Sequence, residues 1–256
     1  MLYFLNRSIP FFTPVLILIG LEIVLIKPSL LWWIALFLLV IFFLSFWQLT
    51  NRKFNKEFWQ LFSAPFLFFL SSLLFFTLLT PKNDWLKHLI ILFIVISLVV
   101  ILESIFNFFH RREKYPLYTI ENIYSYLDLI TLFFSLTSFY SLIIFSNFPV
   151  WPFLLLVIFL VSLLGYQVFW ANKILNRKSL TFILIISLII GELFWIINFW
   201  PTSFYFNALF LTLFYYIMIG LSRYHLLDHL EKKIIKRYLI ISGTCLLILL
   251  LTTPWG

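Results

Sequence analysis

The chain has 256 residues, of which 63% are hydrophobic, 22% aromatic and only 11% charged. Soluble domains are typically about 45–50% apolar and about 25% charged, so this composition excludes a soluble globular enzyme, a disordered tail and a nucleic-acid-binding module. The formal net charge of +8 is therefore expected to act at a membrane surface, and the sequence predicts an integral membrane protein.

Long apolar runs fill almost the whole chain. A helix needs roughly 20 apolar residues, within a range of about 17–25, to cross the hydrocarbon core of a bilayer, and runs without polar alternation indicate helices rather than a transmembrane β-barrel. The nine runs are residues 10–27, 29–49, 58–80, 86–109, 124–146, 152–171, 180–200, 204–221 and 238–254. We expect an all-α fold with one transmembrane domain over residues 1–256 and nine membrane-spanning helices, or eight if a terminal run does not span.

The first run contains an acid, Glu22, around its middle to outer half. A carboxyl group inside a membrane is expensive and is a candidate functional group by default. No cation appears at the same depth, so we expect the neutral form of Glu22, because desolvation disfavours the charged form.

The fourth and fifth runs carry acids near their predicted cytoplasmic ends. Glu103 is followed by Asn107, and Asp128 is followed by Thr131 and Ser135, which share one helical face. We expect Glu103 and Asp128 to approach each other or a shared water pocket, which makes these five residues one candidate polar site. The structural alternative is that the hydroxyl groups bond back to their own helix.

The seventh and eighth runs are joined by a short turn around Thr202, which would bring Glu192 level with Thr212 and within a turn of Tyr215. We therefore expect Glu192 to face inward in its neutral form, and we group Glu192, Thr212, Tyr215 and Glu22 as a candidate buried polar site. Gly191 would permit a close approach of helices. The alternative is a hydrogen bond that only fixes packing.

The last cytoplasmic loop, residues 222–237, combines leucine and isoleucine with five basic residues. This pattern predicts an amphipathic helix at the membrane interface, where its cations would attract anionic lipid headgroups. His225 and His229 are four residues apart, but they lack further ligands, so we expect no metal site.

Basic residues predict the orientation of the chain. With a cytoplasmic N-terminus and nine spans, fifteen of the eighteen Lys and Arg fall on the cytoplasmic side, and only Lys27, Lys82 and Lys87 fall outside. Because basic loops are retained in the cytoplasm, we expect a multi-pass protein of the cell membrane with its C-terminus outside.

Known catalytic motifs are absent: the sequence has no zinc-protease motif, nucleophile elbow, P-loop or dinucleotide fingerprint. Its one cysteine, Cys245, excludes an internal disulfide and a cysteine-based zinc site. We expect no cofactor and no nucleic-acid partner, with the lipid bilayer as the main environment. The favoured function is transport or translocation that uses buried protonatable acids. The alternatives are a membrane scaffold or complex subunit, and an enzyme acting on a membrane-embedded lipid.

Overall fold

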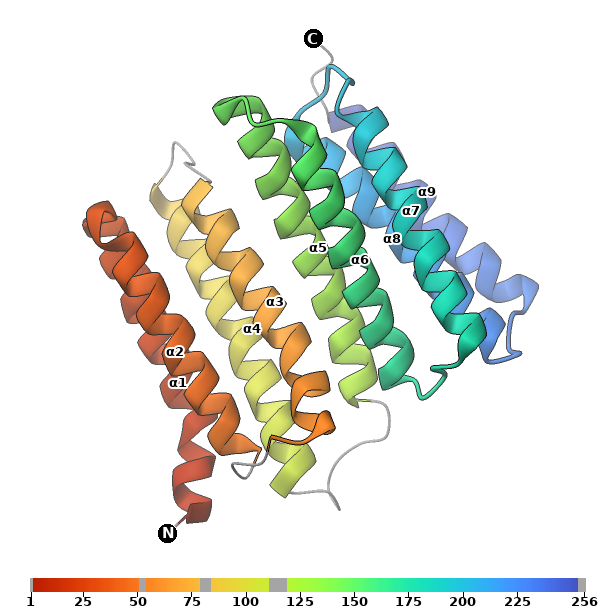
Figure 1. Cartoon of the computed structure of the whole chain (residues 1–256). Coiled ribbons are helices and arrows are strands. Elements are labelled where there is room, and N and C mark those ends of the chain that lie inside the picture. Colours follow the sequence, from red (N-terminus) through yellow and green to blue (C-terminus); the bar gives the residue numbers. More distant parts are fainter. Residues whose placement is uncertain (1, 51–53, 79–83, 111–118, 253–256) are drawn as a thin grey trace. The chain divides into compact units, whose positions relative to one another are not determined.

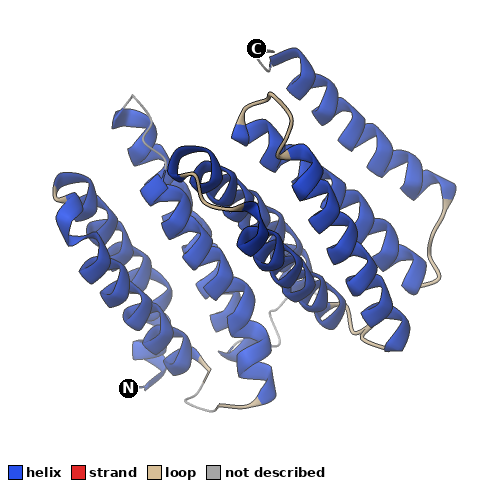
Figure 2. Ribbon diagram, turned by 45° about the horizontal axis from the view of Figure 1, so that its top comes forward, coloured by secondary structure: helices blue, strands red, loops and turns tan. Residues whose placement is uncertain are grey.

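A computed structural model describes residues 2–50, 54–78, 84–110 and 119–252, and the regular elements in these ranges are all helical (Figure 1, Figure 2). Nine of the described helices are long and apolar enough to cross a membrane. The chain is therefore a multi-pass, all-α membrane protein, which confirms the predicted fold class.

The structure divides into two compact units, residues 1–123 and 124–256. The first contains α1 (Leu2–Ile26), a 3₁₀ turn η1 (Pro28–Leu30), α2 (Leu31–Leu49), α3 (Lys56–Leu78) and α4 (Asp84–His110). The second contains most of α5 (Thr119–Ser146), then α6 (Val150–Ala171), α7 (Arg177–Ile197), α8 (Phe204–Leu226) and α9 (Lys232–Thr252).

Helix α1 is the centre of the first unit, since it packs against both α2 and α4, and α3 packs against α4. Aromatic rings join α2 to α3. The ring centroids of Phe42 and Phe69 are 5.1 Å apart, as are those of Phe46 and Phe62. Such pairs add to the energy of burial, so phenylalanine supplies much of the packing here.

In the second unit, α6 packs against α7, α7 against α8, and α8 against α9. Gly191 allows one close approach: a Cβ atom at this position would lie 2.6 Å from Cγ1 of Ile158 on α6. The expected role of Gly191 is thus confirmed, but its neighbour is α6 and not α8. Tyr140 links α5 to α7 by donating a hydrogen bond of 3.0 Å to the carbonyl oxygen of Phe194.

Helix starts follow local sequence signals. Asn176 caps α7 by accepting a hydrogen bond of 2.8 Å from the Ser179 amide, and the Ser179 hydroxyl accepts one of 2.7 Å from the Asn176 amide. Ser203 caps α8 by accepting from the Phe206 amide. These side chains satisfy donors that the first turn leaves free.

Several helices extend beyond their predicted runs, and α1 and α9 do so most. Helix α1 begins at Leu2 and not at residue 10, and α9 begins at Lys232 and not at residue 238. Backbone hydrogen bonds continue through polar residues, so a helix is longer than the apolar segment that crosses the hydrocarbon core.

Candidate functional site

The Glu22 carboxylate on α1 has a partner that sequence reasoning missed. His88 Nδ1 on α4 lies 2.9 Å from Glu22 Oε1. The His88 side chain is 54% exposed and that of Glu22 33%, and both border a shallow hollow of about 220 Å³ whose edge includes Trp85. The expectation that no base lies near Glu22 is therefore wrong.

Glu103 on α4 is also paired. Arg7 of α1 donates a hydrogen bond of 2.5 Å to Glu103 Oε1, and Asn107 donates one of 3.3 Å to the same oxygen. The Arg7 guanidinium also lies over the rings of Phe106 and Phe11, at 5.2 and 5.5 Å from their centroids. This arrangement holds one ion pair between two aromatic rings, so its first role is to fix α1 against α4.

The two pairs share one register between antiparallel helices. Arg7 and Glu22 are fifteen residues apart on α1, and His88 and Glu103 are fifteen apart on α4, which corresponds to about 22 Å along each helix. The pairs thus fasten the same two helices near their opposite ends. Both acids were candidates for chemistry, and the structure gives each of them a basic partner instead.

Asp128 on α5 has a different environment. Its side chain is 0% exposed, and neither carboxyl oxygen has a hydrogen-bond partner among the described residues. The Tyr215 hydroxyl on α8 interacts electrostatically with the Asp128 carboxyl without forming a hydrogen bond to it. Tyr215 is 1% exposed, and its hydroxyl likewise has no partner in the described part of the chain.

The neighbouring hydroxyl groups mostly bond back to their own helices. Thr131 donates 2.7 Å to the Leu127 carbonyl oxygen, and Thr212 donates 2.8 Å to that of Ala208. Ser135 is buried on the same face as Asp128. The structural alternative is therefore confirmed for Thr131, and Thr212 does not bond to Glu192.

Glu192 lies on the exposed face of α7. No partner for its carboxyl group occurs among the described residues, and the prediction of an inward-facing Glu192 is wrong. The reason is that Gly191, one position earlier, turns toward α6 and packs on Ile158. A step of about 100° along the helix then points residue 192 outward. An acid left in lipid costs about 2.5–3.5 kcal/mol.

These placements describe the candidate residues within each unit. In the second unit, Tyr215 interacts electrostatically with Asp128. Glu22, Glu103 and Asn107 belong to the first unit. There Glu22 contacts His88, and Glu103 accepts from both Arg7 and Asn107. Sequence reasoning named Asp128 and Tyr215 separately but did not join them, because an interaction between residues of α5 and α8 leaves no trace in residue spacing.

The loop between α8 and α9 also differs from its prediction. Residues 222–237 form no single amphipathic helix, because a C-terminal cap interrupts them at Asp228. Asp228 has φ 56°, its amide donates 3.1 Å to the His225 carbonyl oxygen, and the His229 amide donates 3.0 Å to that of Tyr224. This pattern is a Schellman motif, which ends α8 before α9 begins.

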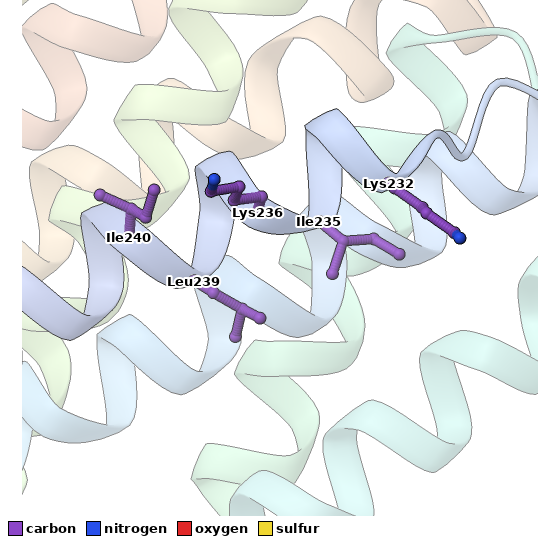
Figure 3. Close-up of a pocket in the computed structure, with 5 residues that line it drawn as sticks. All are labelled: Lys232, Ile235, Lys236, Leu239 and Ile240. Atoms are coloured by element: carbon purple, nitrogen blue, oxygen red, sulfur yellow. The ribbon is translucent and has the colours of Figure 1, made fainter.

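The basic end of α9 borders a surface hollow of about 370 Å³, lined by Lys232, Ile235, Lys236, Leu239 and Ile240 (Figure 3). The two lysines are one helical turn apart, and the apolar side chains continue along the same stretch of helix. No group of three or more potential metal ligands occurs in the described ranges. The hollow therefore combines cations with apolar contacts and has no acid in its lining.

Comparison with known proteins places the chain in one family. A family model described as a protein of unknown function, DUF5656, matches residues 12–252. The chain belongs to this family. The matched residues include most or all of each of the nine described spans and extend over both units. No curated protein and no solved structure matches it.

Proposed function

We propose that this DUF5656 chain is a membrane transport protein in which Asp128 binds and releases a proton. The observation that carries the proposal is the burial of Asp128, whose two oxygens have no partner among the described residues, and its electrostatic interaction with the Tyr215 hydroxyl, which also lacks a partner there. Of the four acids within the predicted spans, Asp128 is the one that is both buried and without a basic partner among the described residues.

The chemistry follows from the cost of a buried charge. An isolated carboxylate in an apolar interior is disfavoured, so Asp128 rests in its neutral, protonated form. When water or a polar solute reaches the site, the proton can leave, and the Tyr215 hydroxyl can then donate a hydrogen bond to the carboxylate. The pair thus has a resting form and a charged form, and the charged form exists only while the site is open.

Infrared spectroscopy tests the protonation directly. A protonated carboxyl group absorbs separately from a carboxylate, and its band shifts when the proton is replaced by deuterium. We expect the full-length protein in lipid to absorb in this region, to lose one component of that absorption in Asp128→Asn, and to shift the component after transfer to deuterated buffer. Glu103→Gln is the matched control, because Glu103 has Arg7 as its counter-ion and its substitution should leave the band in place.

Transport is tested in proteoliposomes loaded with a pH-sensitive dye. Addition of a carried solute should change the internal pH, and the change should disappear in Asp128→Asn while Glu103→Gln retains it. Carboxyl absorption that Asp128→Asn leaves unchanged, or a pH change that survives this substitution, would contradict the proposal.

For the orientation, we propose a cytoplasmic N-terminus and an external C-terminus. Several of the basic residues behind this proposal lie outside the described residues: Arg52, Lys53, Lys82, Arg111, Arg112 and Lys114. In a Cys245→Ser background, cysteines at Asn55 and Asn176 should resist a membrane-impermeant thiol reagent in intact cells, and a cysteine at Asn83 should react. The reverse labelling pattern would overturn this orientation.

We also propose that the hollow at the start of α9 binds anionic lipid headgroups. Lys232 and Lys236 supply the charge, and Leu239 and Ile240 supply apolar contact for an acyl chain. Native mass spectrometry with phosphatidylglycerol should detect retained lipid, and Lys232→Gln with Lys236→Gln should reduce it. The control is Lys173→Gln with Lys178→Gln, which removes the same charge elsewhere. Equal loss in both double variants would indicate a general charge effect and no site.

A second candidate function is that of a subunit in a membrane assembly. The exposed Glu192 favours it, because an acid on the outer face of a spanning helix calls for a polar partner.

A further inference from the structure

Exposed residues on α7 repeat at alternating intervals of four and three. They are Thr181, Ile185, Leu188, Glu192 and Trp195, and all five are exposed. We call these five residues the α7 seam. Repetition of this kind over a helix is the geometry of side-by-side helix packing, in which each residue fits between four residues of a neighbouring helix. The seam runs about 21 Å along the helix, most of the hydrocarbon thickness.

The apolar members of the seam do not by themselves require a protein neighbour. Ile185, Leu188 and Trp195 are 47%, 53% and 42% exposed, and lipid chains would cover them as well as a helix would. Glu192 differs, because lipid offers its carboxyl group neither a hydrogen-bond donor nor an acceptor. The occupant of the seam must therefore supply a polar group at the depth of Glu192.

We infer that the α7 seam is the contact surface for a second copy of this chain. All copies in one membrane share one orientation, so two α7 helices related by a two-fold axis along the membrane normal run parallel and at equal depth. Such a dimer places Glu192 opposite the partner's Glu192. A neutral carboxyl group both donates and accepts hydrogen bonds, so each carboxyl supplies what the other lacks.

The position of Glu192 within the seam gives it a second role. The Thr181 hydroxyl donates to the Arg177 carbonyl oxygen of its own helix, which leaves Glu192 as the seam's unsatisfied polar group among the described residues. One such group in a mainly apolar helix contact specifies the register and the number of helices. Leucine contacts alone tolerate sliding by one turn, whereas a carboxyl pair is satisfied only when the two copies are level. Glu192 thus selects the symmetric two-fold arrangement, the commonest for soluble homo-oligomers.

Disulfide cross-linking of the full chain in its membrane tests the surface. In a Cys245→Ser background, Leu188→Cys should form a disulfide-linked dimer under mild oxidation. Leu247→Cys on α9 is the matched control, because its residue is similarly exposed, at 58%, but lies outside the seam. Dimers from Leu188→Cys in excess of those from Leu247→Cys support the inference, and equal or reversed yields overturn it.

The role of Glu192 is tested in the same cross-linking background. Glu192→Gln retains a donor and an acceptor and should keep the Leu188→Cys dimer. Glu192→Leu should lower its yield by roughly threefold to tenfold, the size expected for a hydrogen bond between helices in a membrane. Photobleaching of a fluorescently tagged chain without any added cysteine gives an independent count. Two steps per spot support a dimer, and single steps throughout would overturn it, as would a yield that Glu192→Leu leaves unchanged.

Discussion

In the first unit, the two acids within the predicted spans each contact a base, whereas in the second unit neither such acid does so among the described residues. Glu22 and Glu103 join α1 to α4 through His88 and Arg7. Asp128 is enclosed without a counter-ion, and Glu192 faces outward. Paired acids contribute to the stability of a helix pair, while an unpaired buried acid costs stability and persists where it has another use. The comparison therefore points to the second unit as the location of the chemistry.

The largest expected effect on stability comes from breaking the stronger pair in the first unit. Arg7→Leu leaves Glu103 partly buried without its cation, and we expect the free energy of unfolding to fall by about 2 kcal/mol. This is below the 3–5 kcal/mol typical of fully buried pairs, because the two side chains are 33% and 28% exposed. Unfolding in mixed micelles measures it, and Arg7→Leu with Glu103→Leu together should recover part of the loss.

An acid-to-leucine change in the second unit should have the opposite sign. Asp128→Leu removes a buried group whose oxygens lack partners among the described residues, so we expect a gain of about 1–2 kcal/mol, together with loss of the Asp128 component of the infrared absorption. The matched change in the first unit, Glu103→Leu, should destabilise because it strands Arg7. If both variants destabilise equally, Asp128 has a partner within the fold and the contrast between the units fails.

Tyr215→Phe should have a smaller effect of the same sign as Asp128→Leu. The hydroxyl is buried and unpartnered, so its removal should leave stability unchanged or raise it by up to about 1 kcal/mol. In proteoliposomes the variant should move protons more slowly, since the charged form of Asp128 loses a donor. A drop in stability would mean that the hydroxyl makes a hydrogen bond in the membrane.

The smallest effect is expected at the exposed pair. His88→Ala removes the partner of Glu22 where both groups meet solvent or headgroups, so we expect a loss of about 0.5 kcal/mol or less. The same measurement at two salt concentrations sharpens the result, because screening should reduce the loss further. A loss as large as that of Arg7→Leu would show that the two pairs contribute equally.

The sequence by itself determined the membrane class, the helical fold and the nine spans. These follow from the length of each apolar run, a local property that the thickness of the bilayer constrains. It also identified the four acids, because their cost in a membrane depends on residue type and depth. Gly191 was correctly assigned to a close helix contact, because a residue without a side chain lets two helices approach.

Tertiary structure decided what each acid contacts. Arg7 and Glu103 are 96 residues apart, and His88 and Glu22 are 66 apart, so no local pattern links them. The same holds for Asp128 and Tyr215 on α5 and α8. The outward direction of Glu192 depends on which helix Gly191 packs against. The depth of a residue along a helix can be counted from the sequence, but whether its side chain faces protein or lipid is determined by the packing of the other helices.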